Sequence, residues 1–139
     1  MSRVPLRPLA AVLSFIDCIN GADLGGLCAL MSDDHRLVVL DEPALVGRGA
    51  NVDAWKGYFS SFPDYVIYPR HVAANGSRVA VLGATTGSHL GLPDEEELQI
   101  GVIWVADVVG GVLSSWQVVE DTPDARARYG VLAGSSTST

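Results

Sequence analysis

The sequence predicts an α+β fold, in which three N-terminal helices pack on a cone-shaped, curved antiparallel sheet. Two observations support this. Helical periodicity dominates the first part of the chain, whereas long runs rich in Val, Ile and Trp dominate residues 65–121. In residues 98–121, two such runs flank Gly110-Gly111, a pattern typical of a β-hairpin. A hairpin of this length needs further strands and a helical cover to be stable in water.

Different sequence features predict each of the three helices. Residues 8–20 place apolar side chains at helical spacing. Asp23 is a suitable N-cap for a short helix that runs to Met31. A third helix is expected from about residue 51 to residue 62, with its aromatic residues on one face.

The expected strands form a meander after this last helix. A short buried strand at residues 37–40 precedes it, after a turn at residues 32–34. Long strands are expected at residues 65–73, 77–90 and 98–107, followed by the second arm of the hairpin. Asn75-Gly76 joins the first two as a tight turn. Residues 91–97 form the next loop, whose acidic run Asp94 to Glu97 is expected to be solvated.

Length and composition narrow the class of protein. The chain has 139 residues, and we expect one domain over residues 1–132 with a disordered tail at residues 133–139. A net charge of −7 argues against a nucleic-acid partner. No apolar run approaches the roughly 20 residues of a membrane span. Cys18 and Cys28 are expected to be free thiols in a reducing cytoplasm, and no metal or cofactor motif is found.

Residues 9–122 resemble the nuclear transport factor 2-like superfamily, and within it the SnoaL-like polyketide cyclases and the ketosteroid isomerases. Phe62-Pro63-Asp64 followed by the run from Thr86 to Gly91 is similar to the SnoaL-like pattern Phe-Pro-Asp … Gly-Thr-His-x-Gly. The run from Val112 to Glu120 is similar to the last strand of that group, Ile-x-x-His-Trp-Asp-x-x-Asp. The resemblance implies a cavity for a hydrophobic, oxygenated small molecule and a cofactor-free cyclase, isomerase or hydrolase.

Two acid/base positions of the relatives carry apolar residues here. By alignment of the first two helices, Phe15 stands where ketosteroid isomerases have the tyrosine that donates to the oxyanion. Val102 stands where they have a protonated aspartic acid, and where SnoaL-like cyclases have an acid/base aspartate. Losing one oxyanion donor costs roughly 3–4 kcal/mol of transition-state stabilisation. The sequence therefore argues against steroid isomerisation by that mechanism.

His89 is the first candidate for a catalytic residue. A strand extending to residue 90 would place it on the same face as Val79, Val81 and Thr85, and a histidine can exchange protons near neutral pH. A structural, hydrogen-bonded histidine is the alternative. Glu42 matches the general-base position of the isomerases, although a second alignment selects Asp41 instead.

The remaining candidates would bind the substrate. Gln117 and Ser115 replace the aspartate and histidine of the last SnoaL-like strand and can hydrogen-bond a carbonyl or hydroxyl group. An uninterrupted hairpin register places Val102, Trp104, Gln117 and Val119 together on the concave face of the sheet. The predicted substrate-binding set is therefore Gln117, Ser115, Trp104, Val102, Phe15 and Val119.

The same register would expose an apolar patch on the convex face and so predicts a homodimer. That patch would consist of Ile103, Val105, Trp116 and Val118. Two functions stay open. His89 and Glu42 favour an enzyme, whereas the apolar residue at Val102 and the amide at Gln117 favour a small-molecule-binding or dimerisation module without catalysis.

Overall fold

The computed structural model describes residues 6–131, so the predicted tail at residues 133–139 lies outside the described residues. The helices are α1 (Pro8–Asn20), α2 (Leu24–Ala29), α3 (Arg48–Ser61), α4 (Asp94–Glu97) and α5 (Pro123–Tyr129). The strands are β1 (Met31–Val39), β2 (Leu45–Val46), β3 (Val66–Asn75), β4 (Arg78–Thr86), β5 (Val102–Val109) and β6 (Val112–Glu120). No helix within residues 6–131 is long and apolar enough to cross a membrane.

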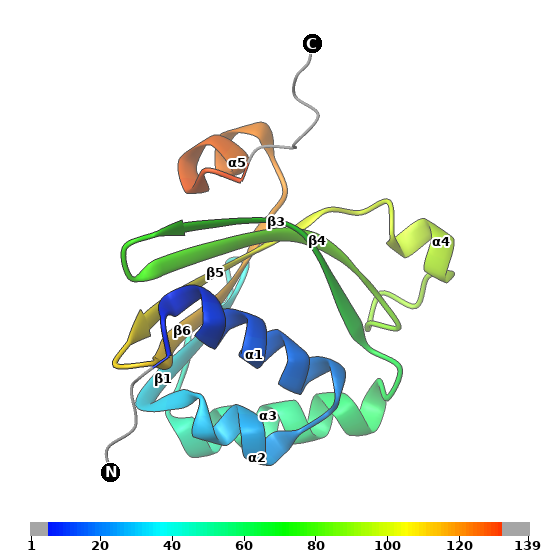
Figure 1. Cartoon of the computed structure of the whole chain (residues 1–139). Coiled ribbons are helices and arrows are strands. Elements are labelled where there is room, and N and C mark those ends of the chain that lie inside the picture. Colours follow the sequence, from blue (N-terminus) through cyan, green and yellow to red (C-terminus); the bar gives the residue numbers. More distant parts are fainter. Residues whose placement is uncertain (1–5, 132–139) are drawn as a thin grey trace.

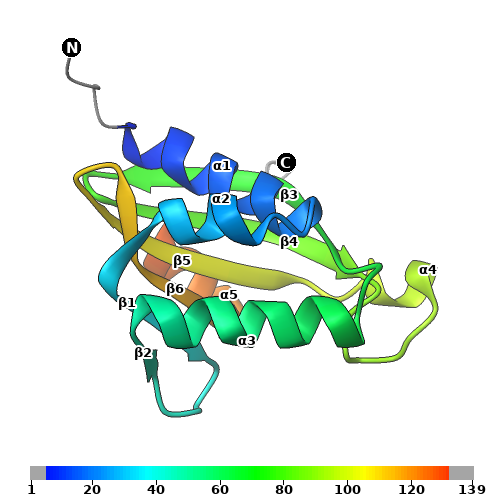
Figure 2. The same cartoon turned by 90° about the horizontal axis from the view of Figure 1, so that it is seen from below.

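The strands form one curved, unclosed six-stranded sheet in the order β2-β1-β6-β5-β4-β3. All neighbours pair antiparallel except β1 and β6, which run parallel. Helices α1, α2 and α3 lie on one side of the sheet, and α5 lies on the other (Figure 1). Figure 2 shows these three helices side by side, with α2 between α1 and α3. The predicted α+β fold class is confirmed.

Several predicted boundaries were wrong. Residues 32–34, expected as a turn, lie within β1, whose pairing with β6 shifts register between Met31 and Arg36. Strand β4 ends at Thr86 rather than near residue 90. The acidic run expected as a solvated loop forms α4, and its last residue, Glu97, is buried.

The hairpin of β5 and β6 contains an irregularity that the sequence analysis missed. Gly110 and Gly111 both have positive φ, 60° and 85°, as a tight two-residue turn requires. Val108 pairs with Leu113, but Asp107 pairs with Ser115, so Ser114 is an extra residue on β6. One inserted residue moves the rest of a strand onto the opposite face.

The bulge exchanges the two faces of β6 relative to the prediction. Trp104 pairs with Val118, and Ala106 pairs with Trp116, so Trp116 and Val118 share the concave face with Trp104. Gln117 pairs with Val105 on the convex face. The predicted concave positions of Gln117 and Val119, and the predicted convex positions of Trp116 and Val118, were therefore wrong.

The convex face is covered by the chain itself. Ile103 and Val105 are buried there with Ala125 of α5 and Val131, in a cluster separate from the main core. With Trp116 and Val118 on the other face, the exposed apolar patch that motivated a homodimer does not exist. Dimerisation stays a prediction, without the interface expected for it.

The β3–β4 hairpin contains a β-bulge, which bends β3. The register shifts between Pro69 and His71, and Pro69 pairs with Gly83. A β-carbon at Gly83 would overlap the carbonyl oxygen of Tyr68, so only glycine fits without a backbone shift.

We expect Gly83→Ala to lower the free energy of unfolding by about 1–3 kcal/mol, because the methyl group forces β3 and β4 apart at this bend. Gly57→Ala is the matched control, since Gly57 lies in α3 with open space around it. That change should raise the free energy of unfolding by roughly 0.5–1 kcal/mol. Urea denaturation measures both, and equal effects of the two substitutions would contradict this account.

His35 is a fully buried histidine in β1. Its Nδ1–H donates to the carbonyl oxygen of Leu113 at 2.7 Å, whereas Nε2 has no hydrogen-bond partner among the described residues. Burial lowers the pKa of His35 below its ordinary value of 6.5, against opposing effects of the Leu113 hydrogen bond and of Asp34. The folded protein therefore holds this ring neutral.

We expect the free energy of unfolding to fall as the pH drops below about 6.5, because the unfolded chain then binds a proton at His35 that the folded chain does not. His35→Gln removes this titration while keeping a donor for Leu113. Urea denaturation between pH 8 and 5.5 should show a weaker pH dependence for the variant. Equal slopes for the two proteins would refute the assignment.

Candidate functional site

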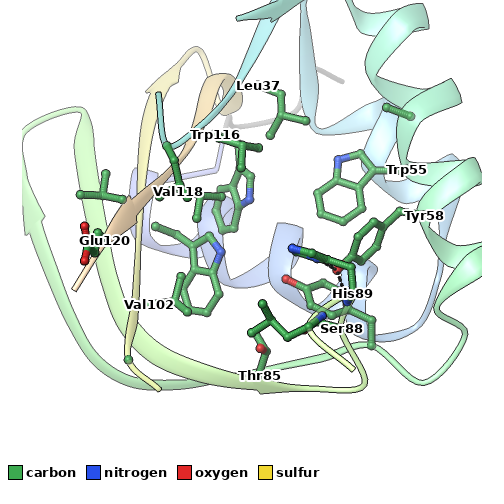
Figure 3. A pocket seen from close by; sticks show the side chains of 18 residues that line it. Leu37, Trp55, Tyr58, Thr85, Ser88, His89, Val102, Trp116, Val118 and Glu120 are labelled. Atoms are coloured by element: carbon green, nitrogen blue, oxygen red, sulfur yellow. Dashed lines mark hydrogen bonds between the residues drawn. The ribbon is translucent and has the colours of Figure 1, made fainter. Parts of the chain in front are cut away.

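A cavity of about 410 Å³ opens between α3 and the concave face of the sheet (Figure 3). Its wall is mainly apolar and aromatic, and it includes all three tryptophans of the chain. The apolar residues that matter most for the argument below are Leu37, Trp55, Val102, Trp104, Trp116 and Val118.

Local structure explains how these side chains converge. Trp55 and Tyr58 are three residues apart on α3, so one face of the helix carries both towards the sheet. Opposite them, the indoles of Trp104 and Trp116 stack with ring centroids 6.4 Å apart. Both indoles are nearly fully buried and form the floor of the cavity.

His89 reaches into the cavity from its rim, where it pairs with Tyr58 (Figure 3). The Tyr58 hydroxyl group and His89 Nδ1 are hydrogen-bonded at 2.8 Å, and the backbone N–H of His89 donates to the same hydroxyl oxygen at 3.3 Å. The imidazole also lies edge-on to Tyr58 and to Phe62. His89 is exposed, so a ligand entering the cavity can reach it.

A tight turn, rather than strand alternation, places His89. Gly87 has φ 70°, and a β-carbon there would overlap the carbonyl oxygen of Asp64. The chain therefore turns at Gly87 directly beside the Phe62-Pro63-Asp64 segment. As a result, both Ser88 and His89 line the cavity, although they are consecutive. The two halves of the Phe-Pro-Asp … Gly-Thr-His-x-Gly pattern thus lie side by side in space.

The phenol groups of the cavity are neutral. Burial raises the pKa of Tyr65 well above its ordinary value of 10, with smaller contributions from Tyr58 and Glu97. The pKa of Tyr58 is also raised, mainly by burial. Both residues line the cavity as protonated hydroxyl groups that can donate hydrogen bonds.

Charge is scarce in the cavity. Among the described residues, its wall contains no lysine or arginine. Glu120 borders it as an exposed side chain at the end of β6, and Glu97 lies behind Thr85. Nowhere in residues 6–131 do three His, Cys, Asp or Glu side chains lie close enough together to hold a metal ion. The site therefore favours an uncharged ligand.

Only part of the predicted site comes together. His89, Val102 and Trp104 line the cavity. Val119 borders it near the end of β6 and also packs with the cluster under α5. Phe15 is fully buried outside the wall, with its ring centroid 4.9 Å from that of Trp116.

The other predicted residues lie elsewhere. Ser115 pairs with Asp107 on the convex face and donates to its carboxylate, and Gln117 is on the same face. Asp41 and Glu42 are exposed in the turn after β1, outside the cavity wall. The prediction that either carboxylate opens into the cavity with His89 was wrong.

Sequence reasoning missed Tyr58, Ser88 and Trp116 as parts of the wall, whereas Thr85 was expected on the same face as His89 and does line the cavity. One signal in the sequence could have revealed Trp116: the large apolar residues Leu113 and Trp116 are three residues apart, with two serines between them. That spacing indicates a bulge rather than strict alternation. For Tyr58, its place beside Trp55 on the aromatic face of α3 was visible, but its partner His89 was not.

The sequence model of the SnoaL-like domain matches residues 12–116. The chain belongs to the SnoaL-like family. The match spans α1 through most of β6 and so includes the elements that build the cavity. No significant match is found among curated proteins.

Solved structures share the fold of this SnoaL-like protein at low sequence identity. A SnoaL-like polyketide cyclase candidate from Jannaschia sp. CCS1 superposes with a TM-score of 0.67 and 19% identity, over 99% of this chain and 98% of that chain. A cystatin-fold protein from Novosphingobium aromaticivorans superposes with a TM-score of 0.71 and 17% identity, over 83% of this chain and 99% of that chain. TerC, co-crystallised with polyporic acid, superposes with a TM-score of 0.67 and 15% identity, over 88% of this chain and 96% of that chain.

Proposed function

We propose that this SnoaL-like protein is a cofactor-free enzyme that performs acid/base chemistry on an uncharged, hydrophobic, oxygenated small molecule. The reaction would be a cyclisation, isomerisation or hydrolysis of polyketide type. One observation carries the proposal: the hydrogen-bonded Tyr58–His89 pair is set on the rim of an apolar cavity. An exchangeable proton is thereby held beside a mainly apolar and aromatic wall.

The geometry suits a proton transfer next to a carbonyl group. A planar ligand would fit between Trp55 and the Trp104–Trp116 floor. With Nδ1–H donating to the Tyr58 oxygen, His89 Nε2 would remove a proton from the carbon beside the carbonyl, and the electron pair would move to the carbonyl oxygen. The neutral hydroxyl groups of Tyr58 and Tyr65 are available to donate hydrogen bonds to that oxygen. They could take the place of the donors that are absent at Phe15 and Val102.

The names of structural neighbours support the ligand class. One neighbour is described as a polyketide cyclase candidate, and another was crystallised with polyporic acid. We further propose a cytoplasmic location, in keeping with Cys18 and Cys28, which form no disulfide.

A non-catalytic binding module is the second candidate. The observation that favours it is that Val102 lines the cavity where the resemblance places an acid/base aspartate, while Asp41 and Glu42 lie outside. Under this alternative, the same apolar cavity would hold a ligand without transforming it.

Two measurements with 2-tetralone, an uncharged bicyclic ketone, separate these functions. Binding should quench the intrinsic fluorescence, because all three tryptophans border the cavity. The enzyme should also accelerate exchange of the ketone's C1 protons with D₂O, followed by NMR. Binding without accelerated exchange would favour the binding module, whereas absence of binding would refute both functions. The anion 2-naphthoate is the control ligand and should bind more weakly, because burying its charge is not compensated by a cation.

A further inference from the structure

Glu97 is a buried carboxylate that the proposed mechanism does not use. It is 1% exposed and ends α4, where it lies behind Thr85 of the cavity wall. Its Oε2 accepts a hydrogen bond from the Thr85 hydroxyl group, and its Oε1 has no hydrogen-bond partner among the described residues.

This arrangement is unfavourable for stability alone. A buried carboxylate loses its hydration, and a single hydroxyl donor compensates for only part of that loss. An apolar side chain of similar volume would often serve the fold as well or better. Glu97 instead orients the hydroxyl group of Thr85, which is 5% exposed and lines the cavity from β4.

The hydrogen bond to Glu97 determines whether the Thr85 hydroxyl group can donate to a ligand or accept from it. The Thr85 hydroxyl group donates to Glu97 Oε2, so its single proton is directed to Glu97 and away from the cavity. The Thr85 oxygen then keeps its lone pairs for another partner. A ligand at this position is therefore met by an acceptor, and the group that complements it is a donor.

We propose that Thr85, oriented by Glu97, is a specificity-determining residue that accepts a hydrogen bond from a hydroxyl group of the ligand. Glu97 is a positioning residue, since it acts through Thr85. The substrate class is then an uncharged aromatic or polycyclic molecule that carries a phenol or alcohol group. This inference rests on the proposed function, because it concerns the same cavity.

The test compares 2-naphthol with 2-methoxynaphthalene, which keeps the rings and the oxygen but lacks the donor. Equilibrium dialysis of the wild-type protein should show 2-naphthol bound about fivefold to tenfold more tightly. Equal binding of both probes would overturn the inference and leave the proposed function standing. Failure of both probes to bind would count against the cavity function itself.

Two variants assign the preference to this pair of residues. Thr85→Val should weaken 2-naphthol binding to the level of the ether and leave ether binding unchanged. Glu97→Met releases the Thr85 proton, so binding of 2-methoxynaphthalene should strengthen severalfold while that of 2-naphthol changes little. A residue that only supported the fold would not produce these opposite effects.

Thr86→Val is the matched control, because Thr86 faces Tyr68 on the other side of β4 and does not line the cavity. Its ligand preference should equal that of the wild-type protein. A wild-type preference that persists in both Thr85→Val and Glu97→Met would overturn the assignment. If Glu97→Met does not fold, the wild-type preference and Thr85→Val still decide the role of Thr85.

Discussion

Replacing His89 with alanine should slow the exchange of 2-tetralone C1 protons by 100- to 10,000-fold, the usual contribution of a positioned acid/base group. His89 lies exposed on the turn after β4 and contributes little to the core, so the fold should be retained. The measurement is the initial exchange rate at saturating ketone, by NMR. The dissociation constant from tryptophan fluorescence should change far less than the rate.

Tyr58→Phe and His71→Ala complete this experiment. Tyr58→Phe keeps the ring that packs on Tyr65 and Phe62 but removes the hydroxyl group that holds the imidazole. It should reduce the rate by less than His89→Ala does. His71→Ala removes a histidine of β3 that does not line the cavity and should keep the wild-type rate. Retention of near wild-type exchange by His89→Ala would rule out its catalytic role.

The fold was predictable because its signals are local. Helix α1 follows from apolar spacing, and α2 follows from the Asp23 cap, which accepts from the backbone N–H of Gly26 at 2.9 Å. The Gly110-Gly111 turn was equally predictable, because glycine adopts the positive φ angles that both positions of this turn require.

The site was less predictable because it depends on register and on long-range contacts. One extra residue, Ser114, reversed the faces of Ser115, Gln117 and Trp116. The hydrogen bond of the buried Glu97 comes from Thr85, which lies on β4 rather than on α4. Neither the bulge nor this hydrogen bond has a strong local signature, and a run of four acidic residues normally indicates a solvated loop.

His89 was predicted for a partly mistaken reason. Strand alternation was expected to carry it to the cavity, but β4 ends at Thr86 and the turn at Gly87 delivers it instead. Its partner proved to be a phenol from α3 rather than a carboxylate from the turn after β1. The proposed chemistry therefore relies on a histidine and two phenol groups, in a cavity wall that contains no lysine or arginine among the described residues.

Phe15→Ala should lower the free energy of unfolding by about 3–5 kcal/mol, the usual effect of deleting a buried aromatic ring. Phe15 is fully buried between α1 and the sheet, in contact with both Trp116 and His35. The aligned tyrosine of the isomerases would give this position a catalytic role, whereas here its position behind the cavity floor gives it a structural one. Urea denaturation measures the loss.

Leu13→Ala is the matched control on the same helix. Leu13 is 39% exposed, so its truncation should change the free energy of unfolding by no more than about 0.5 kcal/mol. Phe15→Leu, which keeps most of the volume, should bind 2-tetralone nearly as tightly as the wild-type protein does, because Trp116 separates Phe15 from the ligand. If Phe15→Leu abolished binding while retaining wild-type stability, Phe15 would be a ligand contact after all, and the placement of the cavity floor at Trp116 would be wrong.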